Sequence, residues 1–310
     1  MTVKTVVAGA SSCYTTVRVD GFPLAYRPTS PPAWAQVSVS GAAAHIAKVQ
    51  AALGCDVRLC TVVGQDVAGE VIRSELGRAG LLGTGVVASE CSSPGIVLVD
   101  GNGRRMGLPY LSPVDRFAYP FAVLREQARD ADLLVLTNAR FVRPLVAPAA
   151  ALGIPIAVDV HLIADLDDEY DRPWLERAQI VFSSHELLPG PYEAWISGVF
   201  ARYRQCEMVG IGLGPGGALL GLRGGTLIRV AAAPPPEVVN TSGAGDALFA
   251  TFLAEWLREG CPVAALQGAV LHSGWKIGHP LPATVSLPPG RLDALRESAP
   301  PATRVGRWDR

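Results

Sequence analysis

The stretch Val238–Gly260, VVNTSGAGDALFATFLAEWLREG, is the one around which the rest of the chain is organised. Its first two residues, VV at 238–239, are β-prone, and a glycine turn, GAG at 243–245, follows them. Residues 247–257 are almost wholly apolar and long enough for three helical turns, and Gly260 is placed to end the helix. The pattern predicts a strand, a tight glycine turn and a buried helix.

The glycine turn has the composition of an anion-binding site. Two of the residues at 243–245 are glycines, so no side chain stands between the backbone N–H groups and a bound anion. The following helix directs its unpaired N–H groups and its positive dipole end at the same point. Asp246 would repel phosphate, but it could take a proton from a hydroxyl that attacks a phosphoryl group held there. The alternative is that Asp246 only stabilises the first helical turn, after a plain connector.

Composition excludes several classes of function. The chain has 310 residues, of which 49% are hydrophobic, and a net charge of −1, so neither nucleic acid nor another polyanion is an expected partner. The six cysteines are scattered without metal-ligand spacing, which favours reduced thiols. The N-terminus resembles a first strand rather than a signal peptide, and the apolar run at 247–257 is too short to span a bilayer. We therefore expect a cytoplasmic protein without a membrane partner.

Strands and helices alternate along most of the chain, which predicts parallel pairing with helices on both faces of one sheet. The expected strands are 3–8, 57–63, 133–136, 156–160, 180–182, 209–211, 218–222 and 226–230. The expected helices are 41–54, 67–79, 119–129, 141–152, 173–177, 247–257 and one that begins at Pro262. The tail from Pro280 is expected to cross the surface. We interpret residues 1–310 as a single domain.

Two segments, about 13–40 and 86–112, break this alternation. Within the second, an apolar run at 96–99, a turn with glycines at 100–103 and a polar run from Arg104 predict a β-hairpin. Together the two segments could form a small sheet, a lid that covers a site and excludes water. The same sheet could instead pair with a second subunit to form a homodimer, or be a surface hairpin without a role.

The run NTSGAGDA at 240–247 resembles the second signature, D-T-x-G-A-G-D, of the ribokinase-like (PfkB) sugar kinase family. The resemblance implies an α/β three-layer sandwich with a mostly parallel central sheet and a small β lid. It implies ATP-dependent phosphorylation of a hydroxyl group of a sugar or sugar-like small molecule. Asp246 would be the catalytic base, and the amides of Gly243, Ala244 and Gly245 would form the anion hole. Asn240 and Thr241 would lie beside the nucleotide.

Two further motifs extend the resemblance to the nucleotide. Ser183–Glu186, SSHE, occupies the place of the family's N-x-x-E motif, which implies Mg²⁺ near Glu186, with Ser183 at the asparagine position. One carboxylate and the phosphates of ATP suffice for Mg²⁺, which prefers oxygen ligands and keeps several waters. The loop Gly212–Gly217 is similar to the family's T-L-G-x-x-G loop. Without the resemblance, the first motif is a helix capping box and the second a plain turn.

The chain differs from the family pattern at one residue of the phosphate loop, and at one residue of the monovalent-cation site. In GLGPGG, Gly214 and Gly217 match the family loop, whereas Gly212 replaces a threonine that contacts phosphate. Asn240 replaces an aspartate that is tied to a monovalent-cation site in many members. The missing carboxylate weakens the expectation of activation by potassium.

The residues expected to bind the acceptor differ from the family pattern at more positions. In SGAAAHIA at 40–47, Gly41 matches the first family signature, but His45 stands where an asparagine bonds sugar hydroxyls. The usual substrate aspartate falls on Tyr14, with Ser12 before it. A pocket with an aromatic ring and an imidazole favours a flatter or less hydroxylated acceptor, such as a nucleoside, over ribose.

The remaining candidates are interpreted with alternatives open. Arg105 in the hairpin could reach the acceptor or a phosphate, or face solvent. His161 and His185 have no partner at metal-ligand spacing and are interpreted as ordinary loop histidines. Besides a sugar kinase, the sequence allows a nucleoside kinase, and it allows a non-catalytic ligand-binding protein on a kinase fold.

Overall fold

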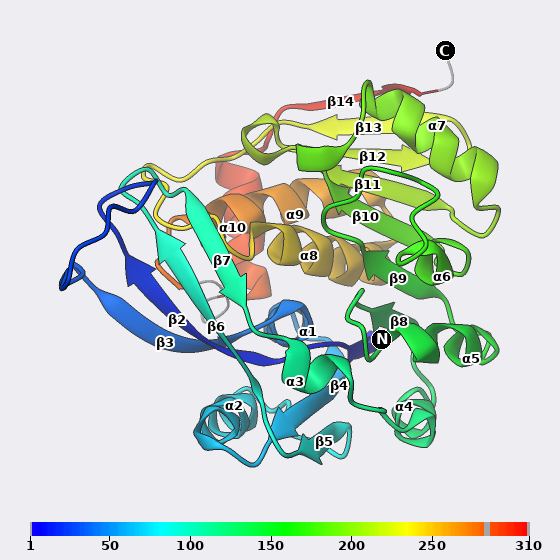
Figure 1. Cartoon of the computed structure of the whole chain (residues 1–310). Coiled ribbons are helices and arrows are strands. Elements are labelled where there is room, and N and C mark those ends of the chain that lie inside the picture. The colour runs from blue at the N-terminus through cyan, green and yellow to red at the C-terminus, as the bar shows by residue number, and fades with distance from the viewer. Residues whose placement is uncertain (1, 282–285, 309–310) are drawn as a thin grey trace.

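The computed structural model describes residues 2–281 and 286–308, which form two sheets and the helices around them (Figure 1). The large sheet has ten strands in the order β14-β13-β12-β11-β10-β9-β8-β1-β4-β5. Its strands are β1 (Lys4–Ala8), β4 (Asp56–Gly64), β5 (Val86–Ser89), β8 (Leu133–Leu136), β9 (Ile156–Asp159), β10 (Ile180–Ser184), β11 (Met208–Gly212), β12 (Ala218–Leu222), β13 (Thr226–Val230) and β14 (Thr303–Arg307). Neighbours from β5 to β11 pair in parallel, and β11 to β14 pair antiparallel.

Helices cover both faces of this sheet, which makes the three layers expected from the sequence. One face packs against α1 (Ala42–Ala52), α2 (Val67–Arg78), α8 (Ala244–Glu259), α9 (Pro262–Ile277) and α10 (Pro289–Ser298). The other packs against α4 (Phe121–Gln127), α5 (Val146–Ala150), α6 (Arg172–Leu175) and α7 (Tyr192–Arg202). Shorter elements are α3 (Ser112–Asp115), η1 (Arg143–Leu145), η2 (His185–Leu187) and η3 (Gly214–Gly216). No helix in the described ranges has both the length and the apolar character needed to span a membrane.

The central strands are apolar at every position because both of their sides are buried. In β8, Leu133 and Val135 belong to the core on the α8 face, and Leu134 and Leu136 belong to the core on the α4 face. This alternation between two cores is the reason that buried parallel strands read as continuous apolar runs rather than as alternating ones.

The small sheet is built from the two segments that break the alternation. Its order is β3-β2-β6-β7, formed by β2 (Ser12–Arg18), β3 (Ala35–Ser40), β6 (Ser93–Val99) and β7 (Arg105–Pro109). We call these four strands the lid, and Figure 1 shows them standing beside the large sheet. Residues 86–89, by contrast, form β5 and pair with β4 in the large sheet.

Two local predictions are wrong, and one helix was not predicted. Residues 238–239 form no strand, because the prolines before them lack N–H donors and Val239 N bonds to Ile277 O, at 2.8 Å, at the end of α9. The tail does not merely cross the surface: it forms α10, which buries Leu292, and β14, which pairs with β13. Helix α7 was not predicted at all. Its buried side chains, such as Ile196 and Val199, pack against the face of the sheet that carries β11 and β12.

The sheet's topology places ligand-binding loops along one edge. The chain runs from β1 to β4 and β5 on one side, and then returns to β8, β9, β10 and β11 on the other. In open α/β sheets ligands bind beyond the carboxyl ends of the strands at such a reversal of strand order. Here the reversal lies between β1 and β8, and α8 begins at the same edge.

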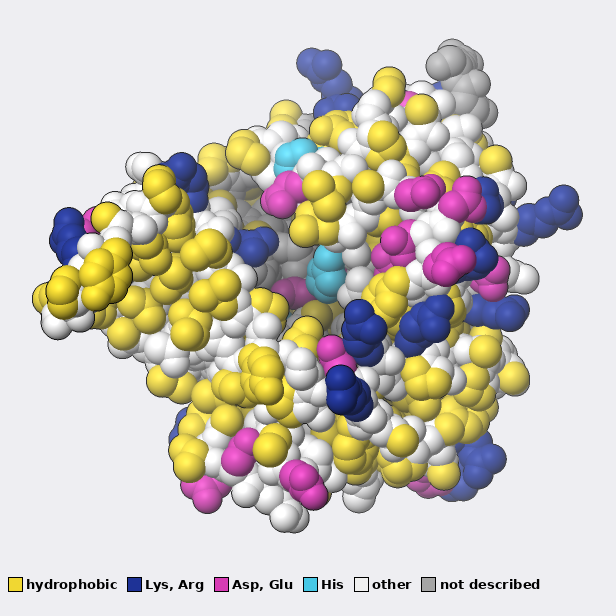
Figure 2. Space-filling view, in the orientation of Figure 1, with side chains coloured by type: hydrophobic (Ala, Val, Ile, Leu, Met, Phe, Trp, Pro, Cys, Tyr) yellow, Lys and Arg dark blue, Asp and Glu magenta, His cyan; other side chains and the backbone are white. Residues whose placement is uncertain are grey.

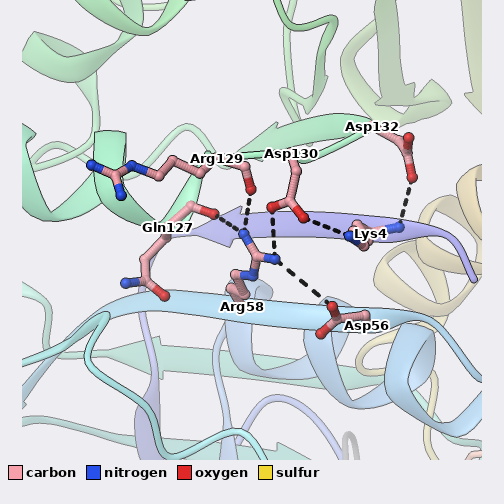
Figure 3. Close-up of polar contacts among 7 residues, drawn as sticks. All are labelled: Lys4, Asp56, Arg58, Gln127, Arg129, Asp130 and Asp132. Atoms are coloured by element: carbon pink, nitrogen blue, oxygen red, sulfur yellow. Dashed lines mark hydrogen bonds and ion pairs between the residues drawn. The ribbon is translucent and has the colours of Figure 1, made fainter.

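The opposite, amino-terminal edge is closed by a polar network (Figure 3). The guanidinium of Arg58 donates to Gln127 O at 2.7 Å and to Asp130 Oδ1 at 2.9 Å, and Lys4 Nζ donates to Asp130 Oδ2 at 2.5 Å. These contacts tie β1 and β4 to the turn before β8. Because this end is occupied by its own side chains, the carboxyl edge is the one available to ligands.

Asp66 anchors the lid to the large sheet. Its carboxylate caps α2 by accepting from Gly69 N at 2.7 Å, and it accepts from both the amide and the hydroxyl of Ser92, directly before β6. Burial alone would raise the pKa of Asp66, but the hydrogen bonds from Ser92 and Gly69 outweigh it and lower the pKa. The carboxylate therefore stabilises the fold when it is ionised.

We expect Asp66→Ala to lower the free energy of unfolding by about 1–3 kcal/mol, because it removes a helix cap and leaves the Ser92 donors unpaired. The difference from the wild type should be full above about pH 4 and shrink as pH falls below it. Urea unfolding at several pH values measures this. Asp56→Ala, which loses only a 3.8 Å contact with Arg58, is the control. Equal losses in the two variants would contradict the anchoring role.

Candidate active site

The start of α8 is a glycine turn with free backbone donors. Gly243 has φ +77°, a left-handed conformation that favours glycine, and Ala244 begins the helix. The amide of Ala244 makes a long bond of 3.3 Å to Thr241 O, and no backbone acceptor within the described residues is assigned to the amides of Gly243 or Gly245. Unpaired N–H groups at the positive end of a sixteen-residue helix constitute an anion site.

Asp246 stands in the first turn of α8 and faces α1. Its Oδ2 lies 3.3 Å from Nδ1 of His45, whose side chain is completely buried, whereas the Asp246 side chain is 16% exposed. Oδ1 of Asp246 has no hydrogen-bond partner in the structure. The carboxylate is thus held by one oxygen, and the other is left without a donor.

Burial and hydrogen bonding act in opposition on this pair. Burial alone would raise the pKa of Asp246, but the hydrogen bond and charge of His45, with His161 and Arg105, outweigh it and lower the pKa. Burial lowers the pKa of His45 more than Asp246 raises it. Both lowered pKa values are consistent with a neutral His45 imidazole that donates from Nδ1 to an ionised Asp246 carboxylate. Asp246 is therefore a charged acceptor around neutral pH.

His161 lies in the loop after β9, as interpreted, but it stands beside a carboxylate, that of Asp159, which the sequence analysis did not single out. Asp159 ends β9, and Nδ1 of His161 lies 3.6 Å from its carboxylate. Burial alone lowers the pKa of His161, but the carboxylates around it, with Asp159 acting most strongly and Asp246 next, raise it. A signal was present, since Asp159 is the last residue of a buried strand and His161 follows two residues later, at the ligand edge.

Lys276 was also missed, and it is the most unusual charge near the site. The side chain is 1% exposed, and its Nζ donates to Asn240 O at 3.0 Å, below the glycine turn. Burial lowers the pKa of Lys276 to about 7, although the charge of Asp246 raises it. Nothing in a mostly apolar helix predicts that this lysine faces the signature loop rather than solvent.

Asn240 and Thr241 hold the loop in place. Asn240 is fully buried; its Nδ2 donates to Pro280 O at 2.7 Å, and its Oδ1 accepts from Ser242 N at 2.8 Å. Thr241 Oγ1 donates to Gly103 O at 3.3 Å, which joins the loop to the lid hairpin. Both side chains therefore bond to the protein itself.

The loops expected to bind the nucleotide lie together at the ends of β10 and β11. His185 Nδ1 is 3.0 Å from Gly212 O, and a Cβ added to Gly214, where φ is +55°, would lie 3.3 Å from the His185 ring. Ser183 Oγ is buried without a partner, and Glu186 is exposed at the start of this loop. At Gly217, φ is +88° and a Cβ would come within 2.0 Å of Val230 O.

The candidate acceptor residues come from the lid and its hinge. Ser12 is buried and its hydroxyl bonds to that of Ser93 in the neighbouring strand. Gly41, with φ +91°, leaves room for Ala10 O, which a Cβ would approach to 2.5 Å. The Tyr14 ring lies over Gly95 and within electrostatic range of Asp246.

Arg105 approaches the site from the lid. Its charge acts on Asp246, on His161 and on Lys276. Figure 2 shows the corresponding hollow between the lid and the large sheet, with acidic and histidine side chains inside it. The predicted site residues thus fall into two groups, one along β10 and β11 and one facing the lid, with Asp246 between them.

The carboxyl edge fits Mg²⁺ with phosphates rather than a closed metal cage. Within the described ranges, no group of three or more His, Cys, Asp or Glu side chains could hold a metal ion alone. The carboxylates of Asp159, Asp246 and Glu186 follow or face neighbouring strand ends, and Mg²⁺ needs only one or two carboxylates when phosphates and waters complete its shell.

Comparisons with known proteins agree with this geometry. The profile described as pfkB family carbohydrate kinase matches residues 198–288, which include the glycine turn and Asp246. An ATP-dependent ribose-1-phosphate kinase of Halopiger xanaduensis is 29% identical over 274 residues, covering 86% of this chain and 89% of the relative. These matches support a PfkB-family carbohydrate kinase, an ATP-dependent enzyme that phosphorylates a sugar hydroxyl, as the resemblance implied.

Solved kinase structures share the fold. The microbiome-derived acarbose kinase Mak1 superposes with a TM-score of 0.86 at 24% identity, over 95% of this chain and 99% of that one. Arabidopsis thaliana ribokinase, solved with ribose and ATP, has a TM-score of 0.78 at 19% identity, over 95% and 99%. The ribokinase-like three-layer fold with a four-stranded lid is confirmed.

We expect His45→Ala to move the acidic limb of the pH profile of kcat/KM upward. The hydrogen bond from His45 lowers the pKa of Asp246, and burial raises it. Without that bond the pKa of Asp246 rises toward or above its ordinary value, so on acidification the carboxylate is protonated, and activity lost, at a higher pH than in the wild type. His45→Asn, which keeps a donor amide, is the matched control and should retain more of the wild-type limb. An unchanged acidic limb in His45→Ala would show that this contact does not tune Asp246.

Proposed function

We propose that this kinase transfers the terminal phosphoryl group of ATP to a hydroxyl of a sugar-like acceptor, with Asp246 as the base. The observation that carries the proposal is the convergence of two features at one point. The ionised carboxylate of Asp246, which has one oxygen without a partner, and the amides of Gly243 and Gly245, which have no assigned acceptor, lie together at the amino end of α8. Phosphoryl transfer requires positioning, charge stabilisation and removal of one proton, and these groups can supply all three.

In this mechanism each group has one task. The acceptor hydroxyl donates to Asp246, which takes its proton as the oxygen bonds to phosphorus and the bond to the ADP oxygen breaks. The amides of Gly243, Ala244 and Gly245 donate to the phosphoryl oxygens and stabilise their charge. Mg²⁺, which Glu186 and the ATP phosphates would hold, supplies neutralisation of the phosphate charge. His45 keeps Asp246 ionised and oriented.

Lys276, when protonated, adds a positive charge beneath this turn. Its ammonium bonds to Asn240 O, three residues before Gly243, and it is shielded from water. In a region of low dielectric constant such a charge acts strongly on an anion held by the nearby amides. The resident ammonium makes a bound monovalent cation at this loop unnecessary, which agrees with the missing aspartate at Asn240.

The acceptor is a sugar or sugar phosphate, and the name of the Halopiger relative makes ribose 1-phosphate the first compound to test. A nucleoside is the second candidate, favoured by the ring of Tyr14 near Asp246. A coupled ADP assay with ribose, ribose 1-phosphate, fructose and inosine separates these classes. Absence of ADP release with every acceptor would count against the proposed activity.

Replacing Asp246 by Asn should reduce kcat by about 10²–10⁴-fold while leaving ATP binding intact, because a positioned base contributes a factor of that size. The carboxamide keeps the shape of the side chain and can still bond to His45. Turnover is measured in the coupled assay, and ATP binding by calorimetry. Glu186→Gln is the comparison, and there the effect should depend on Mg²⁺ concentration. Wild-type turnover in Asp246→Asn would refute the assignment.

Replacing Lys276 by Met should lower kcat/KM by about 10- to 100-fold, comparable to loss of a donor from an oxyanion hole. In the wild type, kcat/KM should fall as pH rises through the pKa of Lys276, about 7, because the ammonium is lost. That limb should be absent from Lys276→Met. Restoration of the variant's rate by K⁺ or NH₄⁺ would support a purely electrostatic role. Identical alkaline limbs in both proteins would contradict it.

A further inference from the structure

Helix α1 carries a buried lysine that the mechanism does not use. Lys48 lies three residues after His45, and its side chain is only 8% exposed, in a stretch of the helix that is otherwise mostly apolar. Its Nζ donates to Glu75 Oε1 on α2 and, at 2.9 Å, to the backbone carbonyl of Val39. Burial lowers the pKa of Lys48, although the hydrogen bond and charge of Glu75 raise it. A cation removed from water needs such partners.

Lys48 and Glu75 together hold both polar backbone groups of Val39. Glu75 Oε2 accepts from Val39 N at 3.2 Å, while Lys48 donates to Val39 O. Val39 belongs to β3, an edge strand of the lid in the described part of the chain. Along an edge strand, every second residue points its N–H and C=O away from the sheet, where they need another partner. The two side chains, which we call the lid clamp, take the place of a neighbouring strand.

The lid clamp lies beside the lid residues expected to bind the acceptor. In the pairing of β2 with β3, Val39 is adjacent to the residue opposite Tyr14 on one side and to the residue opposite Ser12 on the other. Tyr14 is within electrostatic range of Asp246. A shift of Val39 would therefore move these two residues relative to the carboxylate.

One helix fixes both the carboxylate and the lid. His45 bonds to Asp246, and Lys48 bonds to the lid from the next turn on the same side of α1. The charge of Lys48 acts on His45, so the two side chains are close. Most residues of α1 are buried in the core, where close packing resists displacement of the helix. The lid is thus held by the same helix that orients Asp246.

Stability alone does not account for a charged pair at this place. Apolar side chains of similar volume are often as stabilising as a buried ion pair. Apolar residues at positions 48 and 75 could pack between α1 and α2, but they could not bond to the N–H and C=O of Val39. What the charged pair adds is a defined position for β3.

We propose that Lys48 and Glu75 are positioning residues for acceptor binding, which hold Val39 and thereby fix β2 and β3 relative to Asp246. This inference rests on the proposed function. Neither residue touches the acceptor or the nucleotide; both act through the backbone of β3. Small errors in the placement of binding groups are costly in rate, so loss of the lid clamp weakens acceptor binding without altering the transfer machinery.

Hydrogen–deuterium exchange tests the lid clamp without any ligand. Glu75→Leu removes the acceptor of Val39 N, and Lys48→Met removes the donor to its carbonyl. Peptides from β2 and β3 should exchange about 10-fold faster in both variants, as loss of a net hydrogen bond implies. The matched control is Lys4→Met, which removes a lysine–carboxylate pair with Asp130 at the opposite edge of the sheet and should leave exchange in the lid unchanged. Wild-type exchange in the lid of both clamp variants would overturn the proposal.

Steady-state kinetics in the coupled ADP assay show whether the lid clamp acts on the acceptor. The acceptors are ribose 1-phosphate, ribose, fructose and inosine. For any that is turned over, Lys48→Met and Glu75→Leu should each raise the KM of the acceptor about 10-fold or more. The KM of ATP should stay unchanged, because the loops after β10 and β11 belong to the large sheet. Glu75→Gln keeps an acceptor for Val39 N and for Lys48, so it should retain the wild-type KM. An unchanged acceptor KM in both clamp variants would overturn the proposal.

A double variant separates positioning from stability. Lys48→Met combined with Glu75→Leu leaves no buried charge without its partner, so the melting temperature should return toward that of the wild type. The backbone groups of Val39 remain unheld, however, and the acceptor KM and the exchange of the lid should stay raised. Recovery of the acceptor KM together with the melting temperature would show a purely structural role and overturn the proposal.

The exchange measurement also separates this inference from the proposed function, because it needs no turnover. If the wild type phosphorylates none of the four acceptors, the proposed function fails, and exchange decides the lid clamp by itself. Faster exchange confined to the lid strands in the double variant would support the clamp, and exchange equal to that of the wild type would overturn it.

Discussion

The hydrogen bond between His45 and Asp246 is the contact on which the organisation of the site depends. It joins α1 to α8, the two helices that meet under the lid, and it keeps a largely buried carboxylate ionised. A buried charge is costly unless it is paired and hydrogen-bonded. The surrounding cations follow from that requirement: His161 comes from the β9 connection, Arg105 from the lid and Lys276 from α9. Elements distant in sequence thereby converge on one carboxylate.

The same convergence explains which features could be predicted from sequence. The parallel sheet and its helices follow from local patterns, because a strand buried on both faces must be apolar throughout. The glycine turn before Asp246 is local too, and it carried the family resemblance. Asp159 was not singled out, and His161 was interpreted as an ordinary loop residue, because their interaction with Asp246 is a tertiary contact that leaves no local pattern. Lys276 and α10 were missed for a related reason, since burial under a loop or pairing at a sheet edge leaves no local pattern.

The pairing of Asn240 with Lys276 shows how one substitution changes the chemistry around a loop. A carboxylate at 240 would place a negative charge beside the anion site and would need a cation nearby. Asn240 is neutral, and its amide oxygen and nitrogen are used to fix Ser242 and Pro280. Its carbonyl remains, and the ammonium of Lys276 takes it as an acceptor. The positive charge beneath the turn is then part of the chain and does not depend on the ionic composition of the solvent.

Backbone groups predominate on one side of Asp246 and side chains on the other. In the proposed mechanism the phosphoryl side consists mainly of backbone, the amides at 243–245 and the glycine turns at 214 and 217. On that proposal, Ser183 and Gly212 in place of the family asparagine and threonine leave these backbone groups unchanged. In the proposed function the acceptor side consists of side chains, so a residue such as Tyr14 alters what can bind. Departures from the family pattern there concern specificity, and they need not concern the transfer step.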